Sequence, residues 1–106
     1  MLSSESISDE ETRNTIKEVY TKENYLLDPH GAVAFRSLEK YLQNHPEEKG
    51  FILETAHPVK FYDVVEPIIN ERIQVPASVE AIISKEKLST ILEVGFENLK
   101  EFLLSR

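Results

Sequence analysis

The sequence predicts a mostly helical chain with one main short strand, and three observations support this prediction. Apolar residues recur every three or four positions along most of the chain, which is the spacing of amphipathic helices. One run, Phe51–Ala56, has the length and the flanking residues of a buried strand. Because one strand cannot pair its own backbone amides and carbonyls, we expect the 106 residues to be a piece of a larger α/β protein.

The first helix is predicted from a capping signal. Residues 1–7 are rich in Ser and Glu, so we expect a flexible leader there and the ordered segment over residues 8–106. Residues 8–11, Ser-Asp-Glu-Glu, match a capping box, in which the Ser and the second Glu satisfy each other's backbone amides. A helix to about Lys22 should follow, with one apolar face formed by Thr12, Ile16, Val19 and Tyr20.

A second helix start lies at Asp28-Pro29, because Asp caps helices and Pro suits the first helical position. The helix should run to about Gln43. Gly31 in its first turn lacks bulk, which would let a backbone segment or a ligand approach closely. The predicted buried stripe of this helix consists of Ala34, Leu38, Tyr41 and Leu42.

The strand Phe51–Ala56 is bounded by Gly50 and Pro58, and a pairing with Leu88–Val94 or Ile73–Val75 is an alternative to pairing outside the chain. A further helix is expected to be kinked or divided at Pro67, since proline removes an interior amide. Its apolar residues are Phe61, Val64, Val65, Ile68 and Ile69.

Two helices are predicted in the last third of the chain. A short one should cover about Ser78–Ser84, and a longer one should run from Phe96 to about Ser105. Between them, Leu88–Val94 fits neither a helix nor a strand clearly.

Composition excludes several classes of function. With 19 acidic and 12 basic residues the formal charge is −7, which opposes binding to nucleic-acid phosphates. The absence of cysteine excludes disulfides, thiolate metal sites and a catalytic thiol. There is no run of about 18 apolar residues, so we expect no membrane span, and the acidic N-terminus favours a cytoplasmic location.

Few residues have the pattern of a chemical site. The three histidines lack the spacing of paired metal ligands, so no metal is expected. Thr55 lies in the last residues of the predicted strand and His57 just past its carboxyl end, where ligands bind in open α/β sheets, although an ordinary loop fits equally well. The Lys60 amine either lies in water or faces an anionic ligand. No carboxylate pair and no glycine-rich phosphate loop is evident.

Two motifs resemble threonine synthase, a pyridoxal-phosphate enzyme of fold type II. Residues 28–34 read Asp-Pro-His-Gly-Ala-Val-Ala, and residues 54–61 read Glu-Thr-Ala-His-Pro-Val-Lys-Phe, in the family's order. The capping sequence at residues 8–11 and the closing helix Phe96–Leu104 also resemble the C-terminal end of that family. The resemblance covers nearly the whole chain, but only a C-terminal portion of the family's much longer sequences.

The resemblance implies a reaction for the complete enzyme, the conversion of O-phospho-L-homoserine and water to L-threonine and phosphate with pyridoxal 5'-phosphate. The Schiff-base lysine and the glycine-rich phosphate cup would lie upstream, in the remainder of the threonine synthase chain. This segment would therefore contain no catalytic residue and would be inactive alone. Alternatives are a threonine synthase-like phospholyase and a non-catalytic interaction module derived from the same fold.

The resemblance also implies roles for single residues. Thr55 stands where the family supplies a hydroxyl to the pyridine nitrogen of the cofactor. His57 and Lys60 would lie near the active site, and Asp28 and His30 would hold the helix start against the cofactor domain. Gly31 departs from the Thr or Ala often found there in the family, so no side-chain contact is expected from that position.

Overall fold

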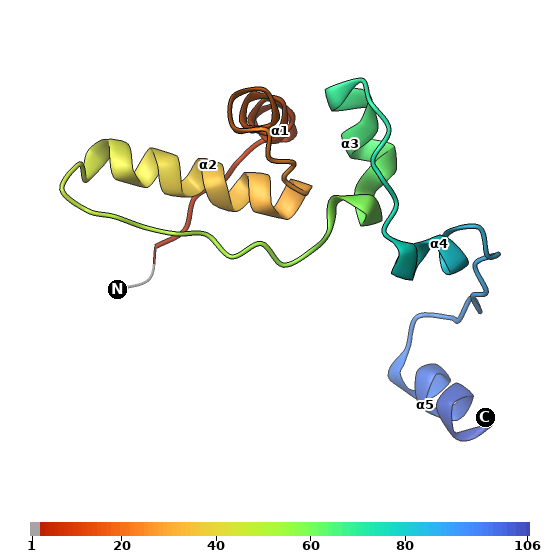
Figure 1. The fold of residues 1–106 in the computed structure, drawn as a ribbon. Helices are drawn as coiled ribbons and strands as arrows, with labels where there is room; N and C mark the ends of the chain where they lie inside the picture. Colours follow the sequence, from red (N-terminus) through yellow and green to blue (C-terminus); the bar gives the residue numbers. More distant parts are fainter. Residues whose placement is uncertain (1–2) are drawn as a thin grey trace. The chain divides into compact units, whose positions relative to one another are not determined.

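The computed structural model describes residues 3–106, which divide into two units at Val75 and Pro76. Each unit is described by itself. Figure 1 labels the α-helices of both, and all the regular elements among the described residues are helical. The first unit contains α1 (Asp9–Glu23), α2 (Pro29–Asn44), the 3-10 helix η1 (Pro58–Phe61) and α3 (Tyr62–Ile69). The second contains α4 (Ala77–Ile83) and α5 (Phe96–Leu104).

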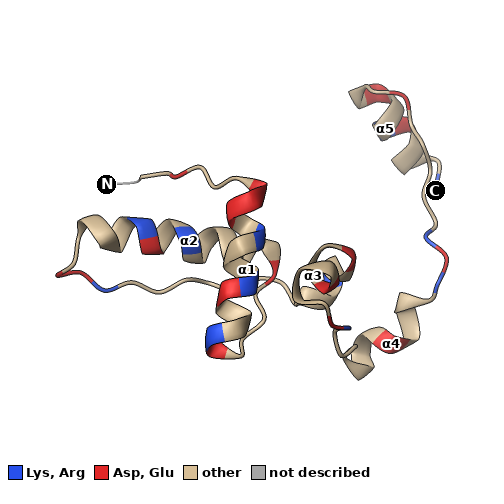
Figure 2. Ribbon diagram, turned by 90° about the horizontal axis from the view of Figure 1, so that it is seen from above, with Lys and Arg blue, Asp and Glu red and all other residues tan. Residues whose placement is uncertain are grey.

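Helix α1 begins with the predicted capping box. The Ser8 hydroxyl accepts the Glu11 amide at 3.2 Å, and the Glu11 carboxylate accepts the Ser8 amide at 2.9 Å. Glu11 also pairs with Lys40 of α2 at 2.9 Å, which joins the start of α1 to the neighbouring helix. Acidic residues gather in this first turn, whereas both signs of charge occur along the rest of α1 and along α2 (Figure 2). Residues 1–2 of the predicted leader lie outside the described residues.

Helix α2 starts at Pro29 and ends one residue beyond the predicted end, so this prediction is confirmed. Its predicted buried stripe is wrong in part. Ala34, Leu38 and Leu42 are only half-buried and Tyr41 is exposed, whereas the small residues Gly31 and Ala32 are buried. Other residues of the first unit cover the first turn of α2. The apolar face of the later turns is largely uncovered.

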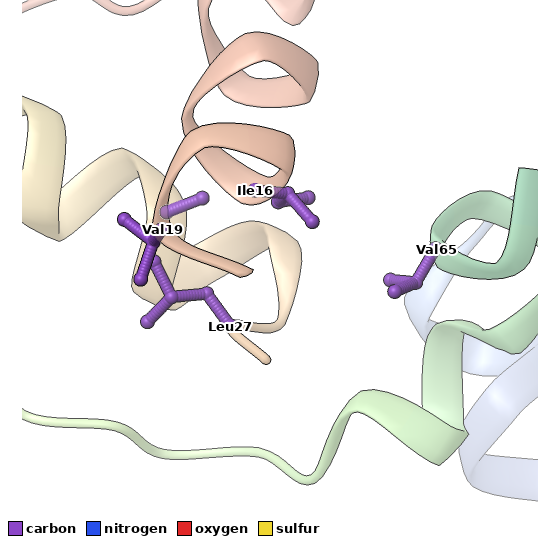
Figure 3. Packing of buried hydrophobic residues seen from close by; sticks show 5 residues of the cluster. Ile16, Val19, Leu27 and Val65 are labelled. Carbon is purple, nitrogen blue, oxygen red and sulfur yellow. The ribbon is translucent and has the colours of Figure 1, made fainter. Parts of the chain in front are cut away.

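A small apolar core joins α1 to α2 and α3. Figure 3 shows Val65 pointing from α3 toward Ile16 on α1, with Val19 and Leu27 beside the start of α2. Ile16 and Val65 are completely buried, so this cluster provides most of the packing that positions the three helices. The half-buried side chains around it are Leu26, Phe35, Ile52, Phe61, Ile68, Ile69 and Ile73.

The predicted strand is absent. Phe51–Ala56 forms an irregular connection below α2 in Figure 1, and no backbone hydrogen bond within residues 3–106 involves it. Neither alternative pairing, with Leu88–Val94 or with Ile73–Val75, is formed. Phe51 and Leu53 are 83% and 73% exposed. A strand needs a partner for its backbone, and the described residues supply none.

Helix α3 continues through Pro67, so of the two predicted alternatives, a kinked or a divided helix, the divided one is wrong. Pro67 lies near its C-terminal end, where its ring removes a single intrahelical hydrogen bond, and Val65 anchors the helix in the core. The preceding turn is η1 rather than α-helix, and its cap is the His57 ring. Asn70 ends α3 in the left-handed conformation with φ 56°, which asparagine tolerates well.

The second unit is thinly packed. Helices α4 and α5 lie within two residues of the predicted bounds, and 88–94 forms no regular element. Neither helix has a buried residue, and many of the unit's apolar side chains are exposed, including those of Ile82, Leu88, Ile91, Val94, Phe96 and Leu103. No helix within residues 3–106 is both long enough and apolar enough to cross a membrane.

Candidate functional site

The start of α2 is organised by a buried carboxylate. Asp28 is fully buried, and its Oδ1 accepts the Gly31 amide at 2.8 Å. Its Oδ2 lies 2.8 Å from Nδ1 of His30, and because an ionised carboxylate only accepts hydrogen bonds, Nδ1 carries the hydrogen. The exposed His30 ring in turn packs at a tilt against Phe61, with ring centroids 5.1 Å apart. Asp28 and His30 thus connect the start of α2 to η1.

A second carboxyl group lies against the same helix start. The Asp28 amide donates to Oε1 of Glu54 at 3.3 Å. A Cβ at Gly31 would lie only 2.6 Å from Cδ of Glu54, a distance that real Cβ atoms essentially never show. The close approach expected at Gly31 is therefore made by a carboxyl group of this chain. Position 31 has room for that group only because glycine lacks a side chain.

The pKa values of the two carboxyl groups are shifted in opposite directions. Burial, and then the hydrogen bond and charge of Asp28, raise the pKa of Glu54 to about 7. Burial would also raise the pKa of Asp28, but hydrogen bonds from Glu54, from the Gly31 amide and from His30 outweigh it and lower that pKa. Below about pH 7 the pair therefore holds one proton, and the opposite directions of the two pKa shifts place it on Glu54.

Thr55 lies in the sequence between Glu54 and His57, and the side chains of both make hydrogen bonds. Glu54 before it contacts the start of α2, while the Nδ1 of His57 after it accepts the Val59 amide at 3.1 Å. The His57 carbonyl also accepts the Lys60 amide at 3.0 Å. Thr55 itself is exposed, and its hydroxyl makes no hydrogen bond within residues 3–106. This hydroxyl is thus held in a defined segment and is free to bond to another molecule or segment.

The structure brings some of the predicted site residues together and separates others. Asp28 and His30 are in contact, and Thr55 is joined to them through its neighbour Glu54. His57 and Lys60 belong to the η1 turn, where Lys60 is exposed. Within residues 3–106, no group of three or more His, Asp or Glu side chains is placed to hold a metal ion.

Sequence reasoning missed Glu54 and found no carboxylate pair. The two acids are 26 positions apart, and Glu54 belonged to a segment predicted to be a strand. The available signal was the unusual glycine in the first turn of α2, which indicated a close approach without naming the group that makes it.

Comparison with known protein families shows to which family the chain belongs. A family profile described as "Threonine synthase, C-terminal" matches residues 31–103, which include most of α2, all of η1, α3 and α4, and most of α5. The chain belongs to the threonine synthase family. The resemblance of the two motifs to the C-terminal part of that family is thereby confirmed.

Individual relatives agree with this assignment. The threonine synthase of Buchnera aphidicola subsp. Schizaphis graminum is 40% identical over 101 residues, which cover 95% of this chain and 23% of that protein. The crystal structure of threonine synthase from Escherichia coli superposes with a TM-score of 0.79 at 35% identity, over 92% of this chain and 22% of that one. The PLP-bound threonine synthase structure from Brucella melitensis gives a TM-score of 0.61 at 29% identity, over 87% and 19%. The chain thus spans less than a quarter of the length of these threonine synthases.

Proposed function

We propose that this chain is the C-terminal part of a threonine synthase that converts O-phospho-L-homoserine and water to L-threonine and phosphate with pyridoxal phosphate. The observation that carries the proposal is the match of residues 31–103 to the C-terminal profile of this family. The threonine synthase structure from Brucella melitensis, which is similar to this chain, is described as PLP-bound. A cytoplasmic location belongs to the same proposal.

The proposed partner of this segment is the remainder of the threonine synthase chain. Several apolar surfaces of the first unit are uncovered and suited to such a partner. A shallow hollow on α2 is lined by Phe35, Leu38 and Leu42, and Phe51 and Leu53 are largely exposed on the connection that follows. Exposed apolar side chains of this kind favour burial against another protein surface.

Thr55 is the proposed contact to the cofactor. Pyridoxal phosphate supplies an electron sink when it is bound. The exposed, unpaired hydroxyl of Thr55 fits a hydrogen bond to the pyridine nitrogen, and a neutral donor adds no charge next to the ring. We propose that His57 holds the backbone after Thr55 through its cap on η1. Asp28 and His30 hold the start of α2, and the exposed Lys60 lies in the neighbourhood of the site.

Replacing Thr55 with valine in the complete enzyme is expected to lower kcat/KM by about 5- to 150-fold. The change keeps the shape of the side chain and deletes its hydroxyl, and a hydrogen bond to a buried acceptor is worth about 1–3 kcal/mol. Steady-state kinetics and the absorption band of the bound cofactor measure the effect, while the melting temperature should move little.

Thr90→Val is the matched control, because Thr90 is exposed in an irregular segment of the second unit. It should leave the kinetics and the spectrum as in the unchanged enzyme. An unshifted spectrum with full turnover in Thr55→Val would refute the proposed contact.

The 106-residue chain alone is expected to release no phosphate from O-phospho-L-homoserine. The lysine and the phosphate-binding loop of the family belong, by resemblance, to the remainder of the enzyme. A colorimetric phosphate assay with added pyridoxal phosphate measures the activity, with the cofactor alone as the blank. Phosphate release above that blank would contradict the proposed division of roles between the segment and the remainder.

A further inference from the structure

We propose that Glu54 is a positioning residue which, in its protonated form, fastens the segment that carries Thr55 to the first turn of α2. The protonated carboxyl group donates a hydrogen bond to the Asp28 carboxylate and accepts the Asp28 amide. The inference deepens the proposed function, because the consequence for catalysis rests on the role of Thr55 as a cofactor contact.

The first turn of α2 provides the space for the Glu54 carboxyl. The Glu54 carboxyl occupies the volume that a side chain at position 31 would fill, with Cδ 2.6 Å from the site of a Gly31 Cβ. Gly31 is itself buried in the helix, and its amide is held by Asp28 at 2.8 Å. The carboxyl group of Glu54 therefore has a defined seat, although the residue as a whole is exposed.

The pair needs one proton. Both oxygens of Asp28 already accept hydrogen bonds, from the Gly31 amide and from His30, which favours the ionised form of Asp28. A second carboxylate beside it would be repelled, so Glu54 is the group that carries the proton. The charged groups acting on the Glu54 carboxyl are Asp28, which opposes its ionisation, and His30, whose protonated form favours it.

Little else holds this segment before Thr55. No backbone hydrogen bond within residues 3–106 involves 51–56, and Ile52 is only half-buried against the core. Glu54 directly precedes Thr55 in the chain. Loss of the Glu54 proton therefore loosens the residue next to the one that carries the hydroxyl. The hydrogen bond that Glu54 donates to Asp28 is therefore present at pH values below the pKa of Glu54, which is about 7, and it is replaced by repulsion between the two carboxylates as the pH rises through that value.

The first test follows the Glu54 carboxyl by ¹³C NMR of the 106-residue chain with labelled glutamate, using Glu54→Gln to assign its signal. We expect a midpoint near 7. Gly31→Ala should lower this midpoint by about one pH unit or more, because the added Cβ displaces the carboxyl from its place beside Asp28. Glu47→Gln, in an exposed turn, is the matched control and should leave the midpoint unchanged. If the 106-residue chain shows no helical circular dichroism, the same titration is carried out on the complete enzyme that contains this segment.

The second test uses the pH profile of the complete enzyme. Glu54→Gln keeps an uncharged donor and acceptor, so the cofactor absorption band should stay in place and the loss of activity above pH 7 that depends on Glu54 should disappear. Glu54→Ala should shift the band and lower kcat by about tenfold or more below pH 7, where the unchanged enzyme has its anchor, and the difference should shrink above pH 7. Gly31→Ala combined with Glu54→Ala should be no worse than Glu54→Ala, because both changes remove the same anchor.

The outcomes separate this inference from the proposed function. A Glu54 midpoint in the ordinary range of glutamate, or one that Gly31→Ala leaves in place, would overturn the anchor whatever Thr55 does. Identical kinetics and spectra of Glu54→Gln and Glu54→Ala would overturn the positioning role. If Thr55→Val has no effect while the midpoint is near 7, the anchor stands and the proposed cofactor contact fails.

Discussion

Replacing Ile16 with alanine is expected to lower the free energy of unfolding of the first unit by about 2–5 kcal/mol. Ile16 is completely buried and lies between α1 and α3, opposite Val65. The lost side chain leaves a cavity in a core of few residues, which cannot repack from a second layer. Urea denaturation of the 106-residue chain, followed by circular dichroism, should show the transition at a lower midpoint or abolished altogether.

Ile91→Ala is the control for this prediction, since the side chain of Ile91 is 96% exposed. Its substitution should change the free energy of unfolding by less than about 0.5 kcal/mol. Equal destabilisation by the two substitutions would show that Ile16 does not belong to a packed core.

Replacing Asp28 with alanine should cost about 2–4 kcal/mol of the free energy of unfolding, because a helix cap is lost and the buried Gly31 amide is left unpaired. Asp28 caps α2 through Gly31 and holds His30. The same change should also lower the pKa of Glu54, since the neighbouring carboxylate that opposes its ionisation is gone. Urea denaturation and the carboxyl titration measure the two effects on one protein.

Two variants identify the cause. Asp28→Asn keeps the capping oxygen, so it should lose clearly less stability than Asp28→Ala. Asp9→Ala removes an exposed acid from the first turn of α1 and should cost less than about 1 kcal/mol. If Asp28→Ala were as mild as Asp9→Ala, the buried cap would contribute no more than a surface charge.

The sequence predicted the helices well because their ends are marked by local chemistry. Ser8 with Glu11, and Asp28 with Pro29, satisfy backbone groups within a few residues, so the same contacts form in any surroundings. The strand prediction failed for the opposite reason. An apolar run such as Phe51–Ala56 becomes a strand only beside another strand, and no neighbour is present in the described part of the chain.

The sequence located the segment of the candidate site, and the roles of its residues stay predictions. The motif around Thr55 pointed to the segment after residue 54, and the structure places an unpaired hydroxyl there. The pairing of Asp28 with Glu54 could not be predicted, because it depends on how a connection of irregular structure returns to the start of α2. Periodicity describes regular elements only, and this contact lies between a helix cap and a loop.

The contact of Glu54 with Gly31 also favours one order in which the two positions change during evolution. A larger residue at position 31 forces the Glu54 carboxyl, the end of a flexible side chain, to move away, whereas a shorter residue at position 54 leaves Gly31 with empty space. Shortening position 54 first is the path without a steric clash, and a side chain at position 31 can then fill the vacated volume. The two positions, distant in sequence, therefore share one volume and should vary together in related chains.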